Sequence, residues 1–247
     1  MQLPNTLIKA FDEYGRGRLA VSLLKDYTNN KSIDSDKLKK ALGSGQFERM
    51  RGSPGHIKAV SPAILLSSIS AFEGFVEQFL AAAMDQSGSS LYEIAVKLGK
   101  LDNPAVKRWR ELCNDLFPAV INTKGYQVTI QDFVQRSKTS DWRNDVELDW
   151  DECEKRAGSW MTVRHVIAHG GATGMGKERW PSLQRANQLA ATDVLKAEKG
   201  DLHSLRFWAA VGAARMHVQA ARHLADQIAA HLGEDLDWSE MPEAFTA

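Results

Sequence analysis

Two long segments of this sequence repeat apolar residues at spacings of three and four, and this period constrains the fold more than any other feature. The first reads SPAILLSSISAFEGFVEQFLAAAMDQSG from residue 61, and the second covers residues 202–232. Such spacing gathers apolar side chains on one face of an α-helix. No alternating segments flank an Asn-Gly or Asp-Gly turn, the usual sign of a β-hairpin. The sequence therefore predicts an all-α helical bundle.

Residues typical of helix ends bound two of the expected helices. Ser61 can cap the first long helix, Pro62 suits its first turn, and Gly88 suits its end. A short helix follows in the segment SSLYEIAVKLG. Ser90 and Glu93 have the spacing of a capping box, so we expect this helix to begin after Ser90.

The rest of the chain divides into further helices and one irregular region. We expect helices at residues 5–27, 103–117 with Asn103 as its cap, 150–168 and 182–195. Residues 118–150 contain a short β-like run, YQVTIQDFV, and then an acidic, aromatic and poorly periodic stretch, so we expect an irregular insertion around 118–150. The expected divisions are an N-terminal helical extension and polar connection at 1–60, the bundle at 61–235 and a C-terminal tail at 236–247.

Composition limits the class of protein. A chain of 247 residues that is 43% hydrophobic can bury a sizeable core. Lys+Arg and Asp+Glu both number 31, so any site for a polyanion must be local. We expect a soluble, cytoplasmic protein with no membrane segment, because no apolar run of membrane-spanning length and no signal peptide is visible. Cys113 and Cys153 form no Cys-x-x-Cys motif and predict reduced thiols.

One segment concentrates residues that carry chemistry, and it reads SWMTVRHVIAHGGATGMG. On an ideal helix His165 and His169 share a face, whereas His169 lies about 140° from Arg164. Gly170 and Gly171 suit a helix C-terminus, where the helix dipole favours a protonated His169. His169 is therefore a candidate acid or base. Arg164, at the border of the apolar stripe, is a candidate for binding phosphate.

The letters RHVIAHG resemble the signature of the HEPN superfamily (higher eukaryotes and prokaryotes nucleotide-binding). That signature is an arginine, four to six residues and a histidine, often within Arg-Asn-x-x-Ala-His-Gly. Arg164 and His169 fall on the two signature positions, and Ala168 and Gly170 match the usual neighbours. His165 occupies the position after the arginine, which is commonly polar. Within this superfamily, the RiboL-PSP-like subgroup is the candidate for the subgroup that the chain resembles.

A second segment also resembles this family. SSISAFEGFVEQFL is similar to an early bundle helix in which an acidic residue faces the site, and Glu73 is the candidate for that residue. The architectural resemblance extends over residues 60–232, whereas the motif covers about seven positions. It implies a HEPN-like helical bundle that dimerises so that the two signature segments meet.

The activity that the resemblance implies is cleavage of RNA without a metal or another cofactor. One His169 would take the proton of the ribose 2′-hydroxyl, the other would protonate the departing 5′-oxygen, and Arg164 would neutralise charge at phosphorus. The products would carry 2′,3′-cyclic phosphate and 5′-hydroxyl ends. His165 would support the site. A toxin or antiphage defence effector is implied, with an antitoxin or another defence protein as a possible partner.

The glycine-rich run GGATGMGKERW follows the signature, and we expect a flexible loop over the active site. Lys177, Arg179 and Trp180 are weaker candidates for contacting RNA, Trp180 by stacking on a base. Other basic clusters are more typical of solvated helix faces, and they comprise Lys37, Lys39, Lys40, Arg49, Arg51, Lys107, Arg108 and Arg110.

Several alternatives stay open from sequence. The pair of Arg164 and His169 can be purely structural, or the chain can be an inactive HEPN module that binds RNA, a nucleotide or a protein. His165 and His169 have the spacing of two zinc ligands, but Val166 stands where a metalloprotease has glutamate. Glu178 stands where a phosphate-binding loop needs Ser or Thr. Some HEPN toxins are silenced by adenylylation of a tyrosine two residues after the histidine, where this chain has Gly171.

Overall fold

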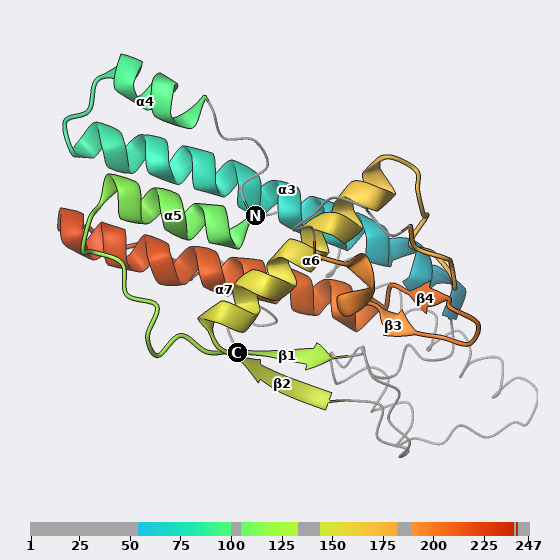
Figure 1. Cartoon of the computed structure of the whole chain (residues 1–247). Coiled ribbons are helices and arrows are strands. Elements are labelled where there is room, and N and C mark those ends of the chain that lie inside the picture. Colours follow the sequence, from blue (N-terminus) through green and yellow to red (C-terminus); the bar gives the residue numbers. More distant parts are fainter. Residues whose placement is uncertain (1–53, 100–104, 133–143, 182–188, 240, 242–247) are drawn as a thin grey trace, which may run out of the picture.

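The computed structural model describes residues 54–99, 105–132, 144–181, 189–239 and 241 (Figure 1). The helix expected at residues 5–27 lies outside the described residues. The elements in chain order are α3 (Pro54–Gln86), α4 (Leu91–Leu98), α5 (Val106–Leu116), β1 (Val128–Asp132), β2 (Asn144–Leu148), α6 (Trp150–Ala168), the 3-10 helix η2 (Ala191–Asp193), β3 (Lys196–Ala197), β4 (His203–Ser204) and α7 (Phe207–Leu232). The predicted all-α class is confirmed.

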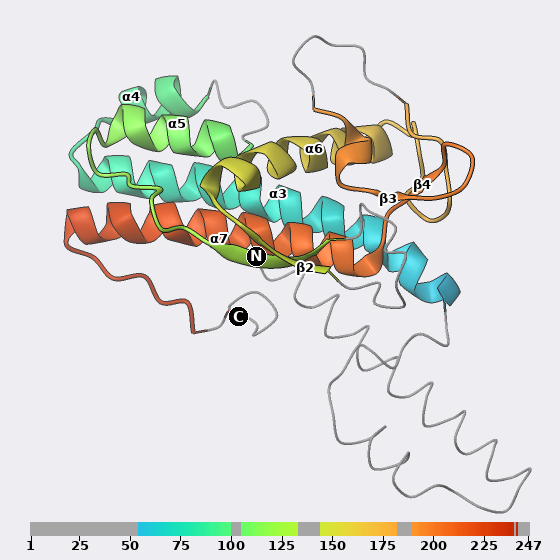
Figure 2. The ribbon, with the colours of Figure 1, turned by 60° about the horizontal axis from the view of Figure 1, so that its bottom comes forward.

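The two longest helices, α3 and α7, lie side by side through the middle of the molecule (Figures 1 and 2). They run in the same direction, so their C-terminal ends lie together. There the Gln86 amide donates to the carboxylate of Glu234, just after α7, at 2.9 Å. Alanines fill much of the buried face of α7 and let the neighbouring backbone come close. Both buried faces are apolar, and the side chains of α3 that no solvent reaches are Ile64, Leu65, Ile69, Phe72, Val76 and Leu80.

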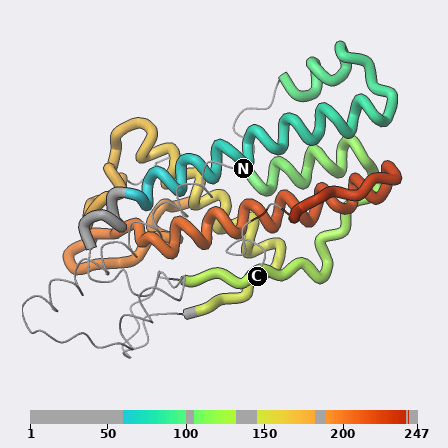
Figure 3. Tube along the Cα trace, turned by 180° about the vertical axis from the view of Figure 1, so that it is seen from behind, coloured from blue at the N-terminus to red at the C-terminus, as the bar shows by residue number. Residues whose placement is uncertain are grey.

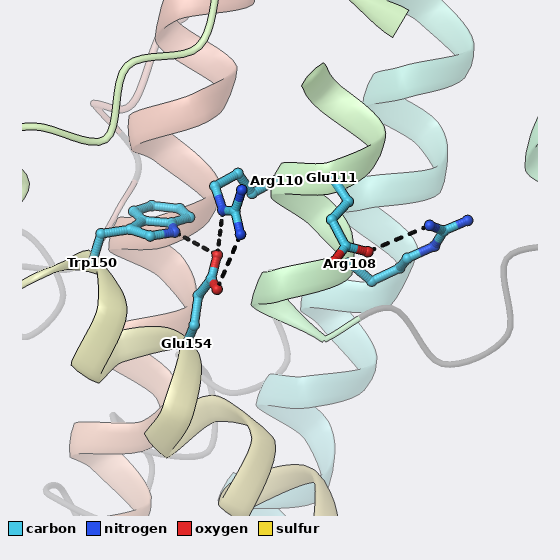
Figure 4. Close-up of polar contacts among 5 residues, drawn as sticks. All are labelled: Arg108, Arg110, Glu111, Trp150 and Glu154. Carbon is cyan, nitrogen blue, oxygen red and sulfur yellow. Dashed lines mark hydrogen bonds and ion pairs between the residues drawn. The ribbon is translucent and has the colours of Figure 1, made fainter. Parts of the chain in front are cut away.

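α5 and α6 pack on this central pair, and α6 crosses it at an angle (Figures 1 and 3). The buried Trp109 of α5 meets the rings of Phe75 and Phe79 edge-on. Glu154 of α6 accepts from Arg110 of α5 and, at 2.6 Å, from the indole of Trp150 (Figure 4). This carboxylate fastens α5 to α6 and holds the indole of the first residue of α6.

The helix ends follow the predictions in part. The Ser90 capping box is present, and α3 ends before Gly88, whose φ is +85°. The prediction that Ser61 caps the first long helix is wrong, because the helix begins at Pro54 and both Ser61 and Pro62 are buried inside it. Packing of the Pro62 ring in the core offsets the backbone hydrogen bond that proline cannot make.

The expected cap of α5 is also wrong. The residue that caps α5 is Ala105 rather than Asn103, and no side chain accepts a hydrogen bond there. The buried face of α5 consists of Val106, Trp109, Leu112 and Cys113. Burial of these side chains, rather than capping, sets the start of this helix.

The region expected to be an irregular insertion holds an antiparallel β-hairpin. Val128 pairs with Leu148 and Ile130 with Val146, and β1 packs on α7. Three of these four side chains are buried, whereas Val146 is partly buried against the core. No short Asn-Gly or Asp-Gly turn marks this hairpin in the sequence, because residues 133–143 separate its strands.

The segment before α7 also differs from the prediction. Of the helix expected at 182–195, the described part, residues 189–195, contains only the single turn of η2. A second small hairpin, β3–β4, follows, so α7 begins at Phe207 rather than at residue 202. From Val60 to Gln86, α3 is long and apolar enough to cross a membrane by length and composition, with a hydropathy of 1.3, but its apolar face forms the core with α7.

His217 makes folding sensitive to acid. It is fully buried on α7, its Nδ1 lies 2.7 Å from the Ala213 carbonyl, and its ring meets Phe72 edge-on. Burial lowers the pKa of His217 from 6.5 to about 4, although the hydrogen bond opposes this shift. Between these values the unfolded chain binds a proton that the folded chain excludes. The free energy of unfolding therefore falls as the pH drops through this window, by about 3 kcal/mol in total.

We expect His217→Gln, which does not titrate, to remove this part of the acid sensitivity. Urea unfolding at neutral pH and near pH 4.5 measures it for wild type and variant. The variant should lose less stability than wild type on acidification, whatever its stability at neutral pH. Equal losses in the two proteins would show that His217 does not take up the proton.

Candidate functional site

The segment singled out in the sequence forms the C-terminal half of α6, up to Ala168, and the glycine-rich loop that follows it. Asp149 caps the start of this helix by accepting from the Glu152 amide at 2.9 Å. Trp160, Val163 and Val166 are buried, which anchors the helix on the bundle. Arg164 lies at the border of this buried face, as the apolar stripe predicted, and 24% of its side chain is exposed.

Arg164 reaches across to α3 and contacts Glu73. The guanidinium Nη2 lies 3.3 Å from Oε2 of Glu73, which is 15% exposed. Burial raises the pKa of Glu73, the charge of Arg164 opposes this, and Glu77 adds to the increase. The other carboxylate oxygen, Oε1, is buried with no hydrogen-bond partner among the described residues. The acidic residue selected from sequence therefore faces the arginine of the motif.

His165 and His169 lie together on the exposed side of α6. Their ring centroids are 4.3 Å apart, with an angle of 51° between the ring planes. Both residues are solvent-exposed, as the shared helix face predicted. Arg164 instead turns toward α3, so within one chain the arginine and the histidines have different surroundings.

Two glycines end the helix directly after His169. Gly170 has a φ of +71°, and its amide donates to the Ile167 carbonyl at 3.1 Å. The Gly171 amide donates to the Val166 carbonyl at 2.8 Å. These two bonds form a Schellman motif, the ending that a left-handed glycine allows. His169 thus becomes the C-cap at the negative end of the helix, as expected.

The glycine-rich loop that follows is fastened rather than loose. Glu178 accepts from the backbone amide of Thr173 at 2.6 Å, from its hydroxyl at 2.7 Å, and from the Gly176 amide at 3.1 Å. Burial tends to raise the pKa of Glu178, but these hydrogen bonds outweigh it and the pKa is lowered. The expectation of a flexible loop did not take this carboxylate into account. In the sequence, Glu178 was noted only as the residue that stands where a phosphate-binding loop needs Ser or Thr.

The weaker RNA candidates separate into exposed and buried residues. Lys177 and Arg179 are exposed, and Lys177 Nζ lies 3.3 Å from Glu198. Trp180 is only 8% exposed, and its indole donates to the His203 carbonyl at 3.3 Å. The structure does not support stacking of a base on Trp180, because the ring is packed in the core.

Among the described residues, the two histidines have no third ligand with which to hold a metal. In the described part of the chain, no three His, Cys, Asp or Glu side chains come together. The zinc alternative therefore has only His165 and His169 to support it. The geometry suits proton transfer and anion binding at the end of α6 better than metal coordination.

Comparison with protein-family models, with curated proteins and with solved structures finds no match for this chain. The resemblance to the HEPN superfamily thus remains a hypothesis, based on the motif and on the contacts around it.

The left-handed ending of α6 can be tested with a matched pair of substitutions. Gly170→Ala should lower the free energy of unfolding by about 1 kcal/mol, because its φ disfavours a side chain although nothing lies within 4 Å of an added Cβ. Gly74→Ala, inside α3 and equally uncrowded, should instead be stabilising by up to about 1 kcal/mol. Urea unfolding measures both. Shifts of the same sign would contradict this explanation of the helix end.

Proposed function

We propose that this protein is a metal-independent endoribonuclease of the HEPN type. One observation carries the proposal. The motif arginine is held by an acidic residue of another helix, while two histidines in contact stand exposed at the glycine-terminated end of the same helix. Acid–base cleavage of RNA needs groups that transfer protons and a group that stabilises negative charge. Solvent-exposed imidazoles and a charged guanidinium can supply both without a metal.

The proposed reaction is an attack of the ribose 2′-hydroxyl on the adjacent phosphorus. One His169 accepts the hydroxyl proton as the new O–P bond forms, and a second His169 donates a proton to the 5′-oxygen as its bond to phosphorus breaks. Arg164 stabilises the negative charge on the pentacoordinate phosphorus. The products carry 2′,3′-cyclic phosphate and 5′-hydroxyl ends, and DNA, which lacks the 2′-hydroxyl, is not cleaved.

The second His169 comes from a second chain in this proposal. Arg164 turns toward α3 whereas His169 is exposed, so a single chain offers its two motif residues to different surroundings. A two-fold axis near the ends of two α6 helices would bring one chain's histidines to the other chain's arginine. Such a dimer would act as a toxin or defence effector, and an antitoxin could silence it by covering this surface.

Glu73 and His165 have supporting roles in this mechanism. Glu73 orients the Arg164 guanidinium from the side of α3, since the two charged groups are 3.3 Å apart and both mostly buried. His165 contacts the His169 ring and limits the orientations that the ring can take. Neither needs to touch the reacting atoms.

Cleavage by the purified protein in EDTA tests the proposal directly. End-labelled RNA and DNA of the same sequence are incubated with wild type, Arg164→Ala and His169→Ala. We expect RNA alone to be cut, with cyclic phosphate ends, and each variant to be at least about 100-fold slower because proton transfer or charge stabilisation is lost. Arg108→Ala and His231→Ala, exposed residues on α5 and α7, are the matched controls and should keep full activity.

Two outcomes would reject this function. Full activity in Arg164→Ala or His169→Ala would show that the motif is not the active site. Absence of cleavage by the wild-type protein on any RNA would favour the alternative of an inactive HEPN module that binds RNA, a nucleotide or a protein.

Mixing two inactive variants tests the shared site. Arg164→Ala and His169→Ala are mixed after brief dissociation, and cleavage is measured together with subunit exchange between differently tagged chains. A mixed dimer combines the His169 of one chain with the Arg164 of the other, which neither parent can do, but it keeps only one of the two His169 side chains. A small part of the wild-type activity, above that of either parent, should therefore return. Proven exchange without any recovery of activity would contradict a site assembled from both chains.

A further inference from the structure

The loop after His169 joins the β3–β4 hairpin to form a small ladder of three segments. The Glu178 amide donates to the His203 carbonyl at 2.9 Å, and the His203 amide donates back to the Glu178 carbonyl at 2.8 Å. β3 pairs with the other edge of β4, with Lys196 opposite Ser204. Residues 177–179, β4 and β3 thus lie next to one another in this order.

The two faces of this ladder differ in character, because side chains alternate along each segment. Trp180 and Leu205 are buried and attach one face to the bundle. The alternation directs Lys177 and Arg179 to the opposite face, and both are exposed. By the same alternation and pairing, Lys196, Glu198, Ser204 and Arg206 belong to this outer face. We call these six outer-face residues the basic ladder.

One carboxylate organises the cations of the basic ladder. Glu198, whose side chain is 6% exposed, accepts from the Ser204 hydroxyl at 2.9 Å, lies 3.3 Å from Lys177 Nζ and also pairs with Arg206. Burial alone would raise the pKa of Glu198, but Ser204 and the two cations outweigh it and the pKa is lowered. Lys177 and Arg206 thus pair with one carboxylate, and the outer face as a whole carries four cations and one carboxylate in a chain of formal net charge 0.

The start of α7 adds to this positive potential. Arg206 is the N-cap of the helix, its first turn contains no acidic residue, and no side chain caps it. The first amides of a helix carry partial positive charge. The Nε of Arg206 is buried without a hydrogen-bond partner among the described residues. Among the described residues, no carboxylate caps the first amides of α7, although the Arg206 guanidinium itself pairs with Glu198 through Nη2.

The basic ladder and the histidines belong to the same end of the bundle. A Cβ built at Gly174 of the loop would meet Pro62 of α3, Ile167 of α6 and Leu205 beside α7, all within 3.4 Å. The loop from His169 to Lys177 thus crosses the point where these three helices meet. Figure 1 shows the resulting path from the end of α6 down to β3 and β4.

We infer that the basic ladder binds the phosphate backbone of single-stranded RNA and guides the strand to the histidines at the end of α6. The choice of RNA rests on the proposed function. Several cations spread over an exposed surface fit a chain of phosphates better than one small anion, which needs an enclosing site. Trp180 is buried, so the ladder offers no ring on which a base could stack. Binding is therefore independent of base sequence and sensitive to salt.

Binding can be separated from cleavage by working in the His169→Ala protein. Fluorescein-labelled single-stranded RNA is titrated and its anisotropy recorded at several salt concentrations between about 50 and 200 mM, a range over which phosphate contacts weaken markedly. Adding Lys177→Ala and Arg179→Ala should lower the affinity about tenfold and reduce the slope of log K against log salt by about 1.4, or about 0.7 for each lost phosphate contact.

The matched control carries Lys97→Ala and Arg108→Ala in the same His169→Ala background. It removes the same types of charge from α4 and α5, which lie far from β3 and β4 in Figure 1, and it should bind as the parent does. Thermal unfolding of all three proteins distinguishes lost contacts from lost folding. A labelled DNA strand should respond to the ladder variants as RNA does, because both have the same phosphates.

The outcomes separate this inference from the proposed activity. A selective loss of RNA affinity in the ladder variant supports the inference, even if the wild-type protein cuts no RNA, which would reject only the nuclease function. Equal affinity in ladder and control variants, or no binding of RNA by the His169→Ala protein, overturns the inference. Cleavage by wild type would then remain to be explained by contacts elsewhere.

Discussion

The close packing of α3 on α7 is the constraint on which the rest of the structure depends. Small side chains on α7, such as Ala210 and Ala213, let the apolar face of α3 approach, and the helices α4, α5 and α6 pack against one or both of these two. Burying each large side chain such as Leu65 contributes about 1.5–3 kcal/mol. Because α3 and α7 run in the same direction, their first turns lie at one end, where the end of α6 meets them.

That meeting point explains why polar chemistry can exist beside an apolar core. Arg164 borders the stripe that anchors α6, so its long side chain passes over apolar neighbours and carries its charge to Glu73. A carboxylate in this position resists ionisation through burial, and the guanidinium compensates. The two charged groups are 3.3 Å apart and come from different helices, α6 and α3, so the contact depends on how these two helices pack.

The apolar periodicity and the residues typical of helix ends predicted those features that depend on neighbouring residues in the sequence. The long helices, the Ser90 capping box, the glycine ending after His169 and the shared face of His165 and His169 all came from spacing alone. The contact between Arg164 and Glu73, 91 positions apart, was anticipated only through the family resemblance. The hairpin β1–β2 was missed, because its pairing depends on long-range packing against α7 rather than on a turn motif.

Charge at the end of the bundle was the least visible feature in sequence. Lys177 and Arg206 are 29 positions apart, and only the bridge between Glu178 and His203 brings their segments together around Glu198. Glu178 also fixes the loop, so one residue organises the loop by its side chain and joins the ladder by its backbone. A chain of formal net charge 0 thereby gathers four cations and one carboxylate on one small surface. Hydrogen bonds between backbone atoms hold these segments together, so the ladder should keep its structure when single cations are replaced. The effect of a lost charge can then be measured without a loss of folding.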